Sequence, residues 1–135
     1  MYDYVNVFID IPVKDERKAF DEGCEAIEES MPDGWKIMAV IDVPFRPLTR
    51  IYEICAPKHA KKALDREMRL LPLMPCKFVC WIENSRLKIG YLKPTAVFGK
   101  MVGDAGDLEE IKDVPVESEK DIQKMAENIA GKLNQ

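Results

Sequence analysis

The chain has 135 residues, a formal net charge of −4 and 47% hydrophobic residues. This size and composition are those of one ordinary globular domain, which buries enough surface to fold without a metal ion or a disulfide. The acidic charge argues against nucleic-acid binding, which usually needs a basic stripe, and against binding to anionic membrane surfaces.

The N-terminus and the cysteines together predict a cellular location. No apolar run approaches the ~20 residues that a membrane span needs. The first four residues lead into a strand pattern without the basic and apolar regions of a signal peptide. We therefore expect a cytoplasmic protein that does not bind membranes, in which the four cysteines are free thiols.

The first half of the chain has the periodicity of alternating strands and helices. Strand patterns of period two cover three segments: residues 4–11, 35–43 and 49–55. In the first segment, the alternation predicts that Val7 and Ile9 share one face and that Phe8 lies on the other. Helical spacing of apolar residues covers residues 15–31 and resumes after Pro57, which suits the first turn of a second helix.

The second half predicts a hairpin followed by a last helix. Its pattern before that helix has four segments: a strand at 76–83, a strand at 87–92, a helical turn at 95–102 and a loop at 103–116. The dipeptide Asn84-Ser85 is typical of the turn between two hairpin strands. Ser118 with Asp121 resembles a capping box and predicts that the last helix begins there.

The order of these elements predicts a single α+β domain, residues 1–135, with a mostly antiparallel sheet and helices packed on one face. Val79 and Trp81 alternate with Phe78 and Cys80, so both faces of their strand are apolar. We expect one face to lie under helices and the other against a second subunit, which predicts a homodimer.

Three segments in the middle of the chain carry a family pattern: IYEICAPKHAKKAL at 51–64, LMPCKFVCW at 73–81 and KIGYLKP at 88–94. Over residues 35–101 the chain resembles the domain of unknown function 302 family of uncharacterised prokaryotic proteins. The resemblance implies a TATA-binding-protein-like fold, in outline strand, helix, four strands and helix with an extra helix after the third strand. It also implies a dimer, but no established activity. Some relatives occur beside sulfur-handling genes, and the family commonly has Asn where this chain has Ala56.

The most suggestive chemistry lies where the third predicted strand meets a helix. Cys55 precedes a first turn that contains Lys58 and His59, and the positive end of the helix dipole with these side chains would lower the pKa of the thiol. Cys76 begins a neighbouring strand. If the two thiols meet, they could form a redox dithiol, a persulfide site or, with His59, a soft metal site. The alternatives are a buried structural role for Cys55 and a solvated position for His59.

The other two cysteines predict packing rather than chemistry. Cys24 lies on the apolar face of the first helix, and Cys80 alternates with apolar strand residues, so both are expected in the core. Cys76 and Cys80 are about 13 Å apart on an extended strand, too far to act on one metal ion or to form a disulfide.

Three functions follow from these features. The first is a binding or carrier module in sulfur or redox metabolism, with Cys55, Cys76, His59 and Lys58 as ligand-binding or redox residues. The second is a small-molecule-binding protein with a cavity between sheet and helices, and the third is a dimeric regulatory protein. The chain lacks a Gly-rich phosphate loop and the common hydrolase motifs, so we expect neither a dedicated enzyme nor a bound cofactor.

Overall fold

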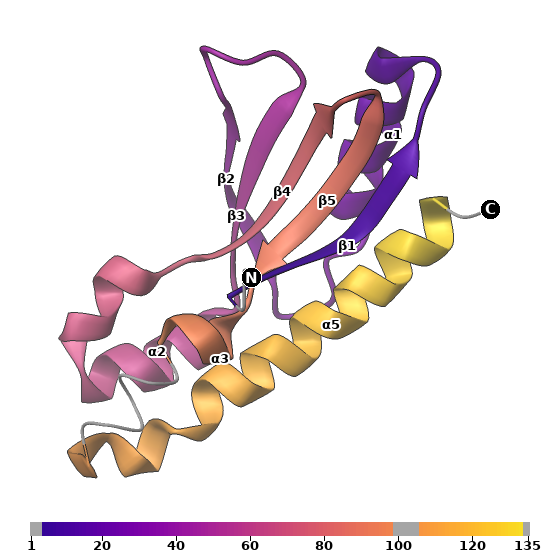
Figure 1. Ribbon diagram of the computed structural model, residues 1–135. Coiled ribbons are helices and arrows are strands. Elements are labelled where there is room, and N and C mark those ends of the chain that lie inside the picture. Colours follow the sequence, from indigo (N-terminus) through magenta and orange to yellow (C-terminus); the bar gives the residue numbers. More distant parts are fainter. Residues whose placement is uncertain (1–3, 99–105, 134–135) are drawn as a thin grey trace.

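The protein is described by a computed structural model that covers residues 4–98 and 106–133 (Figure 1). Its strands are β1 (Val5–Pro12), β2 (Lys36–Asp42), β3 (Thr49–Cys55), β4 (Cys76–Glu83) and β5 (Arg86–Leu92). They form one antiparallel sheet in the order β1-β5-β4-β3-β2. The helical elements are α1 (Glu16–Glu28), α2 (Pro57–Arg66), η1 (Met68–Leu73), α3 (Pro94–Val97), η2 (Gly106–Ile111) and α5 (Asp113–Leu133).

This architecture confirms the predicted α+β class with an antiparallel sheet. The element order also follows the outline that the family resemblance implies, including a helix after the third strand. The likeness of this fold to that of the TATA-binding protein stays a prediction. No helix within the described ranges is long and apolar enough to cross a membrane.

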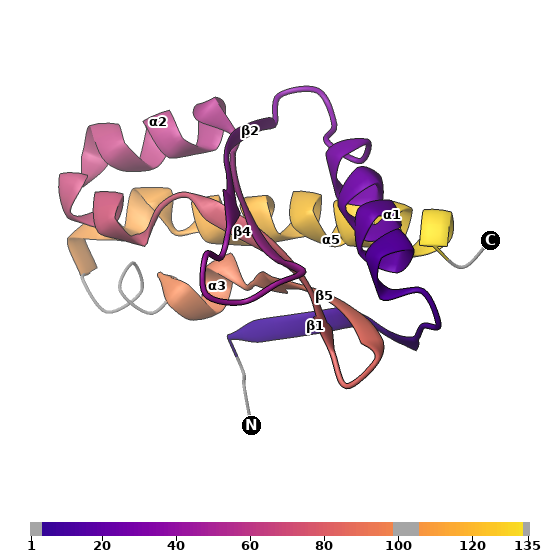
Figure 2. The same ribbon diagram turned by 90° about the horizontal axis from the view of Figure 1, so that it is seen from above.

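The main core lies between one face of the sheet and the helices α1 and α5, which cross each other on that side (Figures 1 and 2). Apolar side chains at helical spacing, such as Phe20 and Ile27 of α1 and Ile122 of α5, meet buried strand residues such as Tyr52 and Ile89. The sheet thus has one face covered by helices, as the sequence predicted.

A second, smaller core lies beyond the end of the sheet. The N-terminal half of α5 extends past the strands and reaches α2 and α3 (Figure 1). Six buried apolar side chains from these elements and their neighbours form this cluster: Ala63, Leu70, Phe98, Leu108, Ile111 and Val114. The first turn of α2 therefore lies between the two cores, beside the ends of β3 and β4.

The start of the last helix differs from the prediction. α5 begins at Asp113, so Ser118 lies inside the helix and the predicted capping box was wrong. Pro115 explains the earlier start, because proline is tolerated only in the first turn of a helix. The predicted loop is likewise replaced by η2 from Gly106 onward. Residues 99–105, where the rest of that loop and of the turn at 95–102 were predicted, lie outside the described residues.

β1 departs from simple alternation. A register shift between Val7 and Ile9 marks a β-bulge, which inserts one residue and reverses the side-chain order. The ring of Phe8 therefore lies with those of Phe78 and Tyr91, each with its centroid 6.0 Å from that of Phe8. Val7 is exposed instead. The predicted division of these residues between the two faces was wrong at this point.

Candidate functional site

A small cavity lies at the first turn of α2, between β3, β4 and α5. Its volume is about 30 Å³, which is room for a water-sized molecule. Six side chains in its lining carry sulfur, nitrogen or oxygen: Trp35, Cys55, His59, Met74, Cys76 and Ser118. Three of the four predicted site residues thus line one cavity. The fourth, Lys58, is exposed and does not line it.

Strand pairing brings the two thiols to this place. Ile54 of β3 pairs with Cys76 of β4, so Cys55, the last residue of β3, follows directly on the residue opposite Cys76. Both cysteines are half-buried and free, without a disulfide. The turn into α2 then places His59 one helical turn beyond Cys55.

The pKa of the Cys55 thiol differs from the sequence-based expectation. Burial raises the pKa of Cys55. Burial, reinforced by the negative charge that Cys55 can carry and opposed by Lys77, raises the pKa of Cys76 to about 12. Removal from water thus outweighs the helix N-terminus, because it penalises the charged form of a thiol. Both thiols are protonated at neutral pH, which makes them slow nucleophiles.

His59 is held by a carboxylate that the sequence analysis assigned to a helix cap. Asp121 of α5 lies with its Oδ2 3.2 Å from His59 Nε2, and the same oxygen accepts a hydrogen bond of 3.0 Å from Trp35 Nε1. A carboxylate only accepts hydrogen bonds, so Nε2 of His59 is the donor in this contact.

Asp121 and Ser118 are the site residues that sequence reasoning missed. They are three residues apart in a helix and so share one face, and on α5 this face points toward α2. Ser118 is buried and lines the cavity. The signal that could have found them is Pro115, because a helix that begins before Pro115 leaves Ser118 and Asp121 free for other partners.

Three basic residues of α2 are paired with acidic neighbours. Lys61 pairs with Asp65 one turn further on, and Lys62 binds Asp113 of α5 at 2.9 Å. Arg66 pairs with Glu110. This face of the helix is therefore a solvated network of ion pairs. Within the described part of the chain, no three His, Cys, Asp or Glu side chains are grouped so that they could hold a metal ion.

The space between sheet and helices is filled by packed apolar side chains, with aromatic rings among them. Phe78 and Tyr91 pack with centroids 5.9 Å apart, and Phe8 packs on both. An open depression of about 290 Å³ runs along β1, β5 and α5 and is lined in part by Asn6 and Gln123. Enclosed sites for drug-sized ligands usually measure ~300–1,000 Å³. The thiol-lined cavity, at about 30 Å³, is too small for such a ligand.

Comparisons with known proteins agree with this fold. The crystal structure of an uncharacterised conserved DUF302 protein from Bacillus stearothermophilus has a TM-score of 0.68 and 21% sequence identity to this chain. The superposition covers 93% of this chain and 98% of the other, and at this identity the similarity concerns the fold alone. No curated protein matches the chain. The sequence profile of the domain of unknown function DUF302 matches residues 13–129, and the chain therefore belongs to the DUF302 family.

Proposed function

We propose that the chain is a thiol-based binding or carrier module whose site is the cavity lined by Cys55, His59 and Cys76. The observation that carries this proposal is the meeting of these three side chains, from β3, α2 and β4, at one cavity. Protonated thiols and room for one water-sized group suit the reversible loading of a small group better than rapid turnover. A cytoplasmic location is part of the proposal, since such a carrier needs free thiols and the cytoplasm keeps thiols reduced.

Cys55 is the proposed carrier thiol, and a sulfane sulfur atom is its proposed cargo. Its position before α2 supports this role, because the N-cap residue Ala56 makes no side-chain hydrogen bond to the first turn. Uncapped amides and the helix dipole favour a negative charge at this end of α2. A persulfide is more acidic than a thiol, so a loaded Cys55 would carry its charge there.

The loading step needs only a low-molecular-weight persulfide as donor. His59 takes the proton of the Cys55 thiol, and the thiolate attacks the outer sulfur of the donor. The sulfur–sulfur bond of the donor breaks, and its inner sulfur leaves as a thiol after taking the proton from His59. One thiol and one persulfide give one persulfide and one thiol, so no oxidant is consumed.

Loading can be tested with glutathione persulfide followed by trapping and peptide mass spectrometry. We expect one added sulfur on Cys55 and none on Cys24 or Cys80, which serve as internal controls. A Cys55→Ser variant should lose the modification, and a Cys76→Ser variant should keep it. Sulfur spread evenly over the four cysteines, or none on Cys55, would contradict the proposal.

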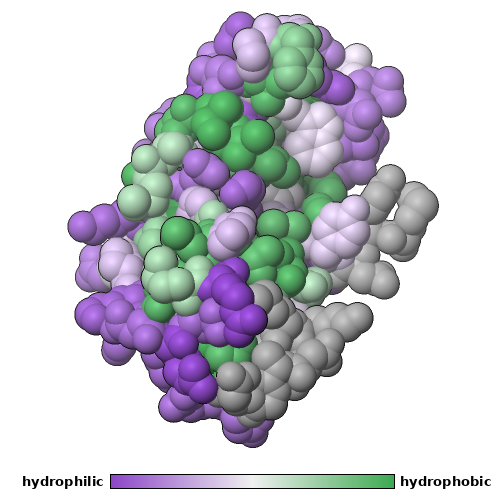
Figure 3. Space-filling model, turned by 90° about the vertical axis from the view of Figure 1, so that its left-hand side faces the viewer, coloured by the Kyte–Doolittle hydropathy of each residue, from purple (hydrophilic) through white to green (hydrophobic). Residues whose placement is uncertain are grey.

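A homodimer through the uncovered face of the sheet is a second candidate, now favoured by a specific observation. Val79 and Trp81 are only half-buried and lie on the face opposite the buried Phe78. Figure 3, which views the molecule from the side of α2, shows hydrophobic side chains gathered in the middle and hydrophilic ones around them. Such a patch with a polar border fits a second copy of the chain.

A further inference from the structure

A second pair of cysteines lies at a different place in the fold. Cys24 of α1 and Cys80 of β4 are 3% and 0% exposed, as the sequence predicted for core residues. The sequence did not predict that their two side chains hydrogen-bond to each other. Gly23 permits this approach, since a Cβ atom there would lie 3.2 Å from Cys80 Sγ.

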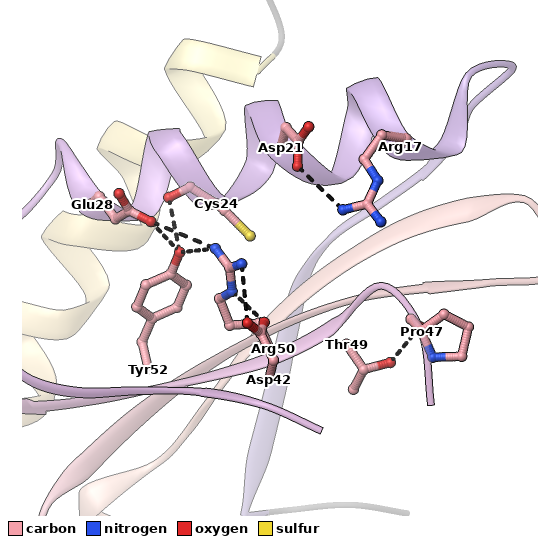
Figure 4. A network of polar contacts seen from close by, with 9 residues as sticks. All are labelled: Arg17, Asp21, Cys24, Glu28, Asp42, Pro47, Thr49, Arg50 and Tyr52. Carbon is pink, nitrogen blue, oxygen red and sulfur yellow. Dashed lines mark hydrogen bonds and ion pairs between the residues drawn. The ribbon is translucent and has the colours of Figure 1, made fainter. Parts of the chain in front are cut away.

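The guanidinium of Arg50 lies beside the side chain of Cys24 (Figure 4). Arg50 of β3 is the strand partner of Cys80, and its guanidinium stands over the ring of Phe20 at 5.4 Å. Asp42 fixes the guanidinium through a 2.7 Å hydrogen bond from Nε. The Arg50 charge favours a negative charge on Cys24.

The rest of this network is anchored on α1. The hydroxyl of Tyr52 donates a 2.5 Å hydrogen bond to Glu28 and lies 3.4 Å from the carbonyl oxygen of Cys24. Arg50 Nη1 is 3.9 Å from the same carboxylate. Figure 4 shows Cys24, Glu28, Tyr52 and Arg50 together between α1 and the strands. The thiol pair is thus bordered by a fixed arrangement of charges.

The two thiols are not equivalent in this setting. Hydrogen bonding with Cys80 lowers the pKa of Cys24 most, and Tyr52 and Arg50 add to this effect, against burial and the charge of Glu28. The same hydrogen bond, with burial, raises the pKa of Cys80. Cys24 is therefore the thiol that ionises first, and Cys80 is the donor to it.

We propose that Cys24 and Cys80 form a peroxide-oxidised dithiol that closes to a disulfide between α1 and β4. The Cys24 thiolate attacks one oxygen of a small hydroperoxide, the oxygen–oxygen bond breaks, and the departing oxygen takes a proton and leaves as water or alcohol. The Cys80 thiol then attacks the sulfenic sulfur of Cys24, and a water molecule leaves. The two thiols lose two electrons, and the hydroperoxide gains them.

Burial selects the class of oxidant. Both sulfur atoms belong to nearly inaccessible residues, so a bulky disulfide such as oxidised glutathione cannot reach them, whereas hydrogen peroxide is little larger than water. Arg50 supports the proposed oxidation as well, because a fixed cation stabilises both the Cys24 thiolate and the charge on the departing oxygen.

The proposal can be tested on the full chain with hydrogen peroxide, alkylation of remaining thiols and peptide mapping. We expect one disulfide between Cys24 and Cys80 with peroxide and none with oxidised glutathione. A Cys80→Ala variant should instead accumulate a Cys24 sulfenic acid, which dimedone traps once the oxidised protein is unfolded in denaturant. An Arg50→Gln variant should oxidise measurably more slowly than wild type, because it lacks the cation that favours the Cys24 thiolate.

Two results would overturn it: wild-type protein that keeps both thiols free after peroxide, or a disulfide that joins Cys55 to Cys76 instead. The wild-type map decides the question even where a variant fails to fold. A Cys55→Ser variant, which removes the proposed carrier thiol, should form the Cys24–Cys80 disulfide at the wild-type rate. Failure of the carrier proposal and failure of this one are therefore distinguishable.

Discussion

Burial governs the chemistry of Cys76 more than its sequence neighbours do. Its thiol lies against the cavity at the start of β4, and its pKa rises from 9.0 to about 12. Lys77 works in the opposite direction but is outweighed. The lysine next to Cys76 in the sequence would lower its pKa, but the pKa is raised, because removal from water depends on neighbours that are distant in the chain.

The raised pKa makes folding stability depend on alkaline pH. Between pH 9 and 12 the thiol of Cys76 stays protonated in the folded state and ionises in the unfolded state, so its contribution is full below pH 9 and is lost as the pH rises. At pH 10 the loss should be about 1.4 kcal/mol. Urea unfolding of wild type and Cys76→Ala at pH 7.5 and pH 10 measures it. An equal alkaline loss in both proteins would exclude this cause.

At the scale of elements, Asp121 joins three parts of the chain. Its carboxylate binds Trp35 before β2 and His59 on α2, while its own backbone belongs to α5. The contact fixes the first turn of α2 against α5, and with it the position of the cavity. The acid is central to the site, although the local sequence pattern around it suggested only a helix cap.

Removing this carboxylate should cost more than removing an exposed one. Asp121→Ala leaves the Trp35 N–H and His59 without their partner, so we expect a loss of about 1–3 kcal/mol in the free energy of unfolding and a change in tryptophan fluorescence. Asp65→Ala, which removes the exposed pair with Lys61, is the matched control and should cost ~0.5 kcal/mol or less. Equal losses in the two variants would show that the contacts of Asp121 contribute no more to the free energy of unfolding than an exposed ion pair does.

Elements with local causes were predictable from the sequence. Thr49–Cys55 and Cys76–Glu83 have the predicted bounds, and Asn84 and Ser85 take the positive φ angles of a hairpin turn. The bulge at Phe8 was not predictable, since it depends on packing against strand residues far along the chain. Pairings across long separations, such as that of Cys24 with Cys80, escape sequence patterns for the same reason.

At the scale of the whole molecule, the two sides of the sheet differ, and the proposed dimer uses the uncovered one. The helices α1 and α5 cover the other side, so the face with Val79 and Trp81 has no helix over it among the described elements. Ion pairs between Glu53 and Lys77 and between Glu83 and Lys88 lie on the same face. Both charge signs therefore border the apolar residues, which lets a copy related by a two-fold axis meet opposite charges.

A charge in the middle of this face tests the dimer. Trp81→Asp should convert the proposed dimer to monomers, because an interface cannot bury an unpaired carboxylate without a cost of several kcal/mol. Light scattering after size exclusion measures the mass. Phe45→Asp is the matched control: its aromatic ring is 89% exposed in the turn between β2 and β3, so its replacement should leave the mass unchanged. A monomeric wild type, or a Trp81→Asp protein that stays dimeric, would remove this face from consideration.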